Sequence, residues 1–295
     1  MTRAQPAPAS ARDAYEVCAA ITRVQAANFS YGIRLLPPAK RDALSAVYAL
    51  ARRIDDIADG GLPPAERAGE LERLRDALAG PPPPDDAVLV AVADAAGRLP
   101  IPMGAFGELI DGGQMDAEMD AGQRRYRTFA ELETYCRCVA GAVGRLCLGV
   151  FGSAPDPAAP RYADALGIAL QQANILRDLR EDLLAGRVYL PAEDLDRFGV
   201  ALRLRDGRLV DDEGRLAALI RFAADRARGW FAEGERLIPL LDRRSAASAA
   251  AMAGIYAALL ERICERPGLV YGGRLSLPVW RKAGIAARAL AGSPR

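Results

Sequence analysis

Helical periodicity is the feature that most constrains the fold of this chain. Between about residues 13 and 290, apolar side chains recur at intervals of three and four, the spacing that gives a helix one buried face. The periodic segments end at Gly or Pro, as at Gly60-Gly61 and at Gly186. The period-two alternation that marks half-buried strands is almost missing. The sequence therefore predicts an all-α fold of roughly eight to ten helices.

Turn-forming residues separate the expected helices, which span about 13–27, 38–59, 65–79, 86–98, 103–120, 128–148, 159–185, 212–241, 245–265 and 278–290. The segment 28–32 is rich in turn formers and is expected to end the first helix. Residues 1–12, rich in Ala, Pro and Ser, are expected to be disordered. Residues 13–295 are expected to form a single domain, because a boundary at the polyproline run 81–84 would divide the residues of one site.

Composition excludes several classes of function. A chain of 295 residues with 51% hydrophobic side chains can bury a large core. Its formal charge of +1 gives no overall basic field, so we expect no nucleic-acid partner. Histidine is absent, which removes Ser-His-Asp and Cys-His catalysis and histidine-ligated zinc. Acid, base or metal chemistry must therefore use Asp, Glu, Tyr, Arg or Lys.

Cysteine usage and the first residues bear on location. Five cysteines, an odd number without C-x-x-C spacing, are typical of a reduced, cytoplasmic chain. The start MTRAQPAPASAR lacks the apolar core of a signal peptide, and no run of about 18 apolar residues indicates a transmembrane helix. Peripheral contact with the inner face of a membrane stays open. Trp280 beside Arg281 and Lys282 is a candidate for that contact, with core or interface packing as the alternative.

One polar stripe runs along the predicted helix 159–185. Gln171, Asn174, Asp178 and Asp182 follow one another at intervals of three, four and four, so they share one face beside an apolar stripe. The two aspartates fall near the end of the helix, where a carboxylate opposes the helix dipole by roughly 0.3–1 kcal/mol. They also repel one another. We expect a cationic partner to offset this cost.

The predicted helix 38–59 repeats that arrangement. Tyr48, Arg52, Asp55 and Asp59 are spaced four, three and four residues apart, and the aspartates again come just before Gly60. A single pair of this kind is weak evidence, because solvated aspartates are common on helices. Two pairs in matching contexts favour a shared role.

Carboxylate oxygens are the ligands that Mg²⁺ prefers, usually one or two per ion together with water and phosphate oxygens. Two acidic pairs facing across a cleft would suit two or three Mg²⁺ ions carrying a diphosphate, provided that the carboxylates stay unpaired. Asn174 adds a neutral oxygen, and Arg52, Arg53 and Arg177 lie near enough to bind phosphate. The cleft walls would be helical and apolar, so the fitting substrate is a diphosphate with a long hydrocarbon tail. No G-x-G-x-x-G follows a strand, and NADPH is not expected.

At these residues the sequence resembles the squalene/phytoene synthase family, the head-to-head prenyl diphosphate synthases. The resemblance lies in FSYGIRLLP (29–37), YALARRIDDIAD (48–59), YCRCVAGAVG (135–144) and ALQQANILRDLREDLLAGRVYLP (169–191). It is closest to the bacterial presqualene diphosphate synthases of hopanoid biosynthesis, with the phytoene synthases next. Arg137 stands where family members commonly have a tyrosine.

The resemblance implies an isoprenoid-synthase helical fold with two Asp-rich helices flanking a central cavity. It implies a catalytic set of Tyr48, Arg52 and the four aspartates, with Tyr48 lining the cavity. The implied Mg²⁺ ligands are Asp55, Asp59, Asn174, Asp178 and Asp182. The implied diphosphate contacts are Asn28, Arg52, Gln171, Arg177, Arg187, Tyr189 and Arg274.

The expected activity is the Mg²⁺-dependent head-to-head condensation of two farnesyl diphosphates to presqualene diphosphate. Three alternatives remain open at this point. One is a phytoene synthase that uses geranylgeranyl diphosphate, and another is a related prenyltransferase that uses a non-prenyl acceptor. The third is a catalytically silent relative that binds lipid or supports an assembly.

Overall fold

The fold is almost entirely helical, as the periodicity predicts. The computed structural model describes residues 10–26 and 29–292. The first half contains α1 (Ala11–Gln25), α2 (Phe29–Ile33), α3 (Pro38–Ala58), α4 (Pro64–Ala79), α5 (Ala87–Arg98), α6 (Gly104–Asp120) and α7 (Phe129–Cys136). The second half contains α8 (Ala142–Phe151), α9 (Ala159–Leu184), α10 (Ala192–Phe198), α11 (Arg215–Gly234), α12 (Arg243–Glu265) and α13 (Val279–Ala291). Two short strands, β1 (Leu204–Arg205) and β2 (Arg208–Leu209), pair antiparallel between α10 and α11.

Three local differences from the sequence-based expectation have physical causes. α1 begins at Ala11 rather than at residue 13, because the Ser10 side chain accepts a hydrogen bond from the Asp13 amide and caps the helix. The part of 28–32 that the structure describes belongs to α2, a five-residue helix packed on α12 and α3. The expected helix 128–148 is interrupted by a π-helix, η1 (Arg137–Gly141), which separates α7 from α8.

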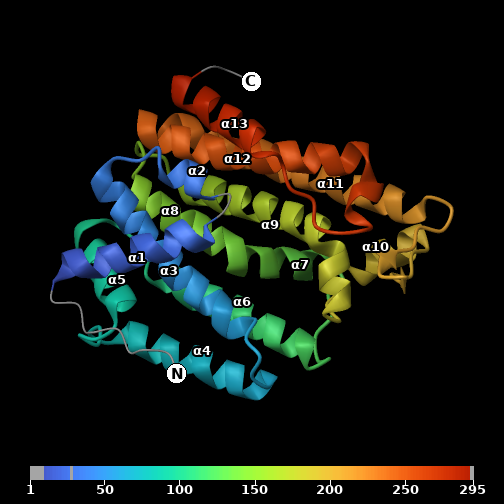
Figure 1. The fold of residues 1–295 in the computed structure, drawn as a ribbon, viewed down its shortest axis with the longest axis horizontal. Coiled ribbons are helices and arrows are strands. Elements are labelled where there is room, and N and C mark those ends of the chain that lie inside the picture. The colour runs from blue at the N-terminus through green and yellow to red at the C-terminus, as the bar shows by residue number, and fades with distance from the viewer. Residues whose placement is uncertain (1–9, 27–28, 293–295) are drawn as a thin grey trace.

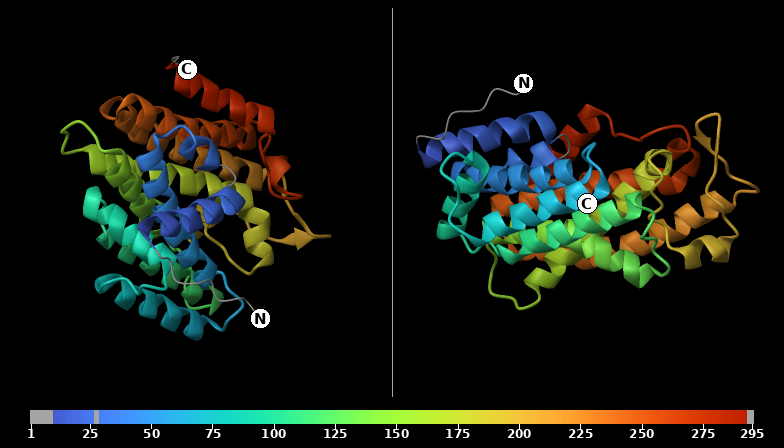
Figure 2. Two further views of the ribbon diagram at one scale, coloured as in Figure 1. Left: turned by 60° about the vertical axis from the view of Figure 1, so that its left-hand side comes forward. Right: turned by 90° about the horizontal axis from the view of Figure 1, so that it is seen from below.

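The long helix α9 lies in the middle of the bundle, in contact with α8, α11 and α12 (Figure 1). Its central residues are apolar around most of the circumference, which is the pattern of a helix buried on all sides. α3 and α6 lie on one side of α9, with α4 beyond them. α12 and α13 lie on the opposite side, and the rotated views in Figure 2 show the same order.

Glycines bring the backbones of α8, η1 and α9 into direct contact. A Cβ atom added at Gly167 would lie 2.1 Å from the carbonyl oxygen of Ala140, and one at Gly144 would lie 2.2 Å from that of Ala163. Real Cβ atoms do not approach backbone so closely, so only glycine fits at these two positions. This close packing sets the wall of the cavity described below.

Two helical stretches are long and apolar enough to cross a bilayer by length and composition alone, Phe129–Phe151 and Arg243–Glu265. Both supply residues to the core of the bundle, among them Leu146 and Leu260, each 0% exposed. Burial inside the bundle therefore accounts for their apolar composition.

Candidate functional site

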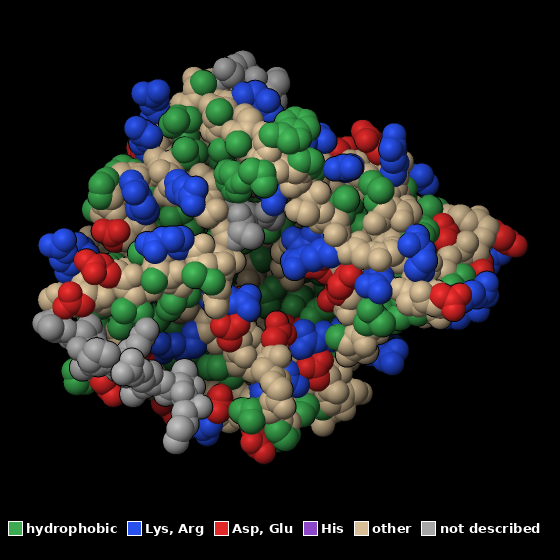
Figure 3. Space-filling view, in the orientation of Figure 1, with side chains coloured by type: hydrophobic (Ala, Val, Ile, Leu, Met, Phe, Trp, Pro, Cys, Tyr) green, Lys and Arg blue, Asp and Glu red, His purple; other side chains and the backbone are tan. Residues whose placement is uncertain are grey.

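A cavity of about 410 Å³ opens between α2, α3, α8, α9 and α12. Most of its wall is apolar, and three aromatic rings, Phe29, Tyr48 and Tyr256, pack with centroids 6.1 to 6.2 Å apart along one side. Its polar lining residues are Gln25, Arg52, Asp55, Gln171, Asn174, Arg177 and Arg274. Figure 3 shows a hollow near the centre of the visible face, green inside and rimmed by blue and red.

On the α3 side, Asp55 lines the cavity and its carboxylate accepts no hydrogen bond from any described residue. The side chain reaches solvent, but surrounding protein atoms cost it hydration. Together with the negative charge of Asp59, this raises the pKa of Asp55 to about 7. The neighbouring Asp56 is turned to Arg52, whose Nη2 lies 2.5 Å from its Oδ1. Asp55, and not Asp56, is therefore the free carboxylate of this helix.

On the α9 side, Gln171, Asn174 and Arg177 line the cavity. Asn174 Nδ2 donates to Gln171 Oε1 at 3.2 Å, which leaves Asn174 Oδ1 buried without a partner. Such an atom normally has a hydrogen bond or another ligand. One turn further along, Asp178 accepts from Arg177 Nε at 2.7 Å and pairs with Arg274 Nε at 2.9 Å.

Asp182 is the unpaired carboxylate on α9. No described residue donates a hydrogen bond to its side chain, and desolvation together with the charge of Asp178 raises the pKa of Asp182 to about 7. Asp59, Asp178 and Asp182 do not line the cavity itself. They follow the lining residues Asp55 and Arg177 along their helices and so lie at its polar end.

These residues fit a Mg²⁺ site. Each acidic pair contributes one carboxylate without a partner, and Asn174 Oδ1 adds an unsatisfied neutral oxygen. Among the described residues, no three acidic or cysteine side chains converge closely enough to enclose an ion. Mg²⁺ is usually held by one or two carboxylates and completes its shell with water and phosphate oxygens.

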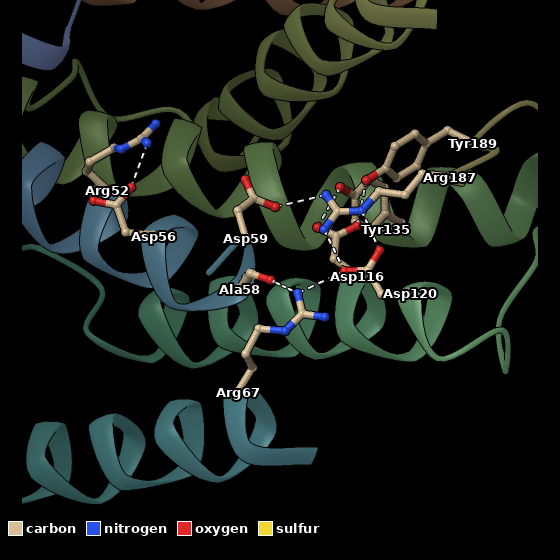
Figure 4. A network of polar contacts seen from close by, with 10 residues as sticks. All are labelled: Arg52, Asp56, Ala58, Asp59, Arg67, Asp116, Asp120, Tyr135, Arg187 and Tyr189. Carbon is tan, nitrogen blue, oxygen red and sulfur yellow. Dashed lines mark hydrogen bonds and ion pairs between the residues drawn. The ribbon is translucent and has the colours of Figure 1, made fainter. Parts of the chain in front are cut away.

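The cationic partners expected for the acidic end of α9 are Arg177 and Arg274, which pair with Asp178. A further arginine, Arg187, follows α9 and pairs with the acidic ends of α3 and α6 (Figure 4). Its Nε and Nη2 donate to the two carboxylate oxygens of Asp120 at 2.6 and 2.8 Å, and its Nη1 donates to Asp59 at 2.8 Å. Buried Arg67 donates to the Ala58 carbonyl and pairs with Asp120 at 2.8 Å. The hydrogen bonds from Arg187 lower the pKa of Asp120. The ends of α3, α6 and α9 are thus tied together.

The structure adds a third acidic pair that the sequence analysis missed. Asp116 and Asp120 are four residues apart at the end of α6, the same spacing and position as in the other two pairs. Asp116 is 8% exposed and accepts from Tyr189 at 2.7 Å and Tyr135 at 3.0 Å. Desolvation raises the pKa of Asp116 to about 6, against the effect of these donors. The signal was available, because the predicted helix 103–120 ends on this D-x-x-x-D pair.

Two expected diphosphate contacts are placed elsewhere. Tyr189 is 6% exposed, stacks on Tyr135 at 5.2 Å and donates to Asp116, so its hydroxyl does not face the cavity. Arg187 is bound to Asp120 and Asp59 rather than lining the cavity.

The other residues that the sequence singled out differ in where they lie. Arg53 makes two hydrogen bonds to Asp86 at the start of α5 and faces away from the cavity. Arg137 pairs with Glu133 at the surface. Asn28 lies outside the described residues. Tyr48 lines the cavity, as expected, and so do Arg52, Gln171, Arg177 and Arg274.

The chain is similar to known proteins over nearly its whole length. The sequence profile of squalene/phytoene synthases matches residues 22–281. A phytoene synthase of Mycobacterium tuberculosis is 56% identical over 281 residues, which cover 95% of this chain and 91% of the relative. A 15-cis-phytoene synthase of Synechococcus elongatus is 37% identical, covering 95% and 93%.

Solved structures show the same fold. A dehydrosqualene synthase in complex with a ligand aligns with a TM-score of 0.79 and 26% identity, covering 96% of this chain and 97% of that one. The squalene synthase HpnC from Alicyclobacillus acidocaldarius aligns with a TM-score of 0.71 and 32% identity, covering 89% and 97%. From its sequence, its fold and its cavity, the chain belongs to the squalene/phytoene synthase family of head-to-head prenyltransferases.

Proposed function

We propose that this protein is a phytoene synthase, which joins two geranylgeranyl diphosphates head to head into a C40 hydrocarbon. The observation that carries the proposal is the 56% identity, over nearly the whole chain, to a protein named phytoene synthase. The motifs alone favoured farnesyl diphosphate and presqualene diphosphate. The relatives favour the alternative on geranylgeranyl diphosphate, and both reactions use the same kind of site.

The cavity has a polar end and an apolar wall, which match the diphosphate and the hydrocarbon tail of such a substrate. The diphosphate belongs at the polar end, where Arg52, Arg177 and Arg274 supply positive charge and Gln171 an amide donor. The hydrocarbon tail belongs along the apolar wall that leads toward Leu44. When bound by Asp55, Asp59, Asn174, Asp178 and Asp182, Mg²⁺ would supply the charge that stabilises a departing diphosphate.

The chain's own residues then have three tasks. The arginines bind the leaving diphosphate, so that the allylic C–O bond ionises. The faces of Phe29, Tyr48 and Tyr256 shelter the allylic cation while the closed apolar wall excludes water, which would quench it to an alcohol. The double bond of the second substrate attacks the cation, and loss of a proton closes a cyclopropane. With no histidine in the chain, departing diphosphate is the base. Loss of the second diphosphate and one more proton gives the C40 product without a reductant.

A product assay tests this proposal. Purified protein with Mg²⁺ is given geranylgeranyl or farnesyl diphosphate without NADPH, and products are identified by mass spectrometry. We expect a C40 hydrocarbon from geranylgeranyl diphosphate, slower turnover of farnesyl diphosphate, and no product after chelation of the metal. Exclusive use of farnesyl diphosphate would contradict the assigned chain length. No diphosphate release from either substrate would contradict the enzyme assignment itself.

One substitution locates the hydrocarbon tail. Cys147 lines the cavity on α8, three residues beyond Gly144, the glycine of this helix that contacts α9. Cys147→Phe fills space at this apolar end, so turnover of geranylgeranyl diphosphate should fall roughly tenfold more than turnover of farnesyl diphosphate. Cys147→Ala, which only removes volume, is the matched control. An unchanged ratio of the two rates would place the tail elsewhere.

A further inference from the structure

The last part of the chain carries only positive charge. Residues 266–292 include five Lys or Arg and no Asp or Glu, whereas the whole chain has a formal charge of +1. The rest of the molecule is therefore net negative. A segment that carries only positive charge is attracted to anionic surfaces.

Helix α13, which lies in this segment, exposes an apolar row to solvent. Trp280 and Val279 are 74% and 70% exposed, which is unusual for side chains of this size. Ala283, Ala287 and Ala291 continue from Trp280 at intervals of three, four and four, and all three are exposed. The row is thus one continuous face of the helix.

The opposite face of α13 is the one that holds it to the bundle. Ala286 is buried, and the helix contacts α12 and α2. Arg281 and Arg288, seven residues apart and both exposed, flank the apolar row on one side. A helix packed on one face, with tryptophan and small apolar residues outward and arginines at the margin, has the pattern of a helix lying in a lipid–water interface.

α13 also lies beside the mouth of the cavity. Its contact α2 supplies Phe29 and Ile33 to the cavity wall, and Arg274, shortly before α13, lines the polar end. In Figure 3, apolar and basic side chains gather over α13 on the same face as the hollow. A further exposed apolar side chain, Val24, directly precedes the lining residue Gln25.

We propose that α13 docks flat on an anionic lipid bilayer, with Val279 and Trp280 in the interface and Arg281 and Arg288 on the headgroups. The mouth of the cavity then faces the bilayer margin, so that a molecule with a long hydrocarbon tail passes between membrane and cavity with little exposure to water. The positive charge of residues 266–292 favours an anionic bilayer over a partner with a purely apolar surface. The proposal concerns the surface of α13 and is tested without substrate or turnover.

The test measures binding of the full chain to vesicles of phosphatidylcholine alone and of equal parts of phosphatidylcholine and phosphatidylglycerol. We expect sedimentation with the anionic vesicles only, loss of binding at high salt, and a blue shift of tryptophan emission that Trp280→Ala removes. In the Trp280→Ala variant the remaining tryptophan is Trp230, which is half-buried on α11. The emission of this variant therefore gives the background signal.

Charge reversals provide the matched comparison. Arg281→Glu with Arg288→Glu should weaken binding to anionic vesicles at least about tenfold. Arg12→Glu with Arg73→Glu changes the charge equally at exposed sites far from α13, the second of them on α4 at the opposite side of the bundle (Figure 2), and should leave binding nearly unchanged. All four positions are exposed, and thermal unfolding checks that each variant is folded.

Three outcomes would overturn the proposal. One is equal binding by the two double variants, and another is equal binding to both kinds of vesicle. The third is a concentration-dependent dimer in sedimentation that Trp280→Ala dissociates, because the apolar row would then be covered by a second copy of the chain.

Discussion

Individual carboxylates at this site differ in their partners. Asp59 and Asp178 are paired with arginines, so the expectation that the helix-end carboxylates stay unpaired was wrong for these two. Asp55 and Asp182 keep no partner among the described residues, and lost hydration together with a neighbouring aspartate raises the pKa of both to about 7. Each helix thus presents one free carboxylate and one that is paired with arginine.

The pKa values of Asp55 and Asp182 predict how metal binding depends on pH. Protonation competes with Mg²⁺, so the affinity for Mg²⁺ should fall as the pH drops through about 7. Calorimetric titration with Mg²⁺ and inorganic diphosphate at about pH 6 and about pH 8 measures this. Asp182→Asn should weaken binding and flatten its pH dependence. An affinity that is constant over this range would contradict the assignment.

The stability of the metal-free protein should show the opposite trend. Both carboxyls keep a proton in the folded state between their ordinary pKa of 3.8 and about 7, where the unfolded chain has released it. Their contribution to stability is full below 3.8 and is lost as the pH rises through about 7. Added Mg²⁺ should therefore raise the thermal midpoint more at about pH 8 than at about pH 6.

Asp120 is the residue on which the cationic network depends. Asp120→Asn leaves buried Arg67 without its carboxylate and releases Arg187 from a two-point contact. We expect a loss of about 1–3 kcal/mol in the free energy of unfolding and a roughly tenfold fall in kcat/KM, with more Mg²⁺ needed for half-maximal activity. Asp111→Asn on the same helix is the control, since it breaks only a half-exposed pair with Arg75. Equal behaviour of the two variants would contradict the role of Asp120.

At the scale of elements, the sequence predicts every helix with a strong apolar period. It misses α10, whose seven residues are too short to establish a period. It also misses η1, where the backbone of Ala140 packs closely on Gly167 of α9, a contact that no local pattern encodes. The acidic pairs can be recognised in the sequence because their i,i+4 spacing lies within one helix. The pairing of Arg187 with Asp59 and Asp120 joins separate helices, and no spacing within one helix encodes it.

The glycine contact between η1 and α9 gives the prediction at this scale. Gly167→Ala places a methyl group against the Ala140 carbonyl, so the two backbones must separate. We expect a loss of roughly 1–3 kcal/mol in the free energy of unfolding and lower activity, because both residues line the cavity. Gly229→Ala in α11, where nothing lies within 4 Å of the added atom, should instead stabilise by about 0.5–1 kcal/mol. Chemical denaturation of both variants measures the contrast, and equal effects would refute it.

Across the whole molecule, the fold brings distant segments to one site. Asp59 and Arg187 are 128 residues apart in sequence and hydrogen-bonded in space. The two acidic helices, α3 and α9, reach the polar end of one cavity from opposite walls, while the apolar wall between them is closed by α8 and α12. The central claim is that both acidic ends act on a single diphosphate through metal ions that they hold together.

A double-mutant cycle on Mg²⁺-dependent binding of an unreactive thio-diphosphate analogue of the substrate tests that claim most directly. Asp55→Asn, Asp178→Asn and the double variant are compared with the unaltered protein by calorimetry, with and without Mg²⁺. If the two ends form one site, each single substitution should lower affinity by at least about tenfold, and the double variant should be little worse than the weaker single variant. Affinity losses that add in full, or binding that does not depend on Mg²⁺, would show that the two acidic ends do not act as one site.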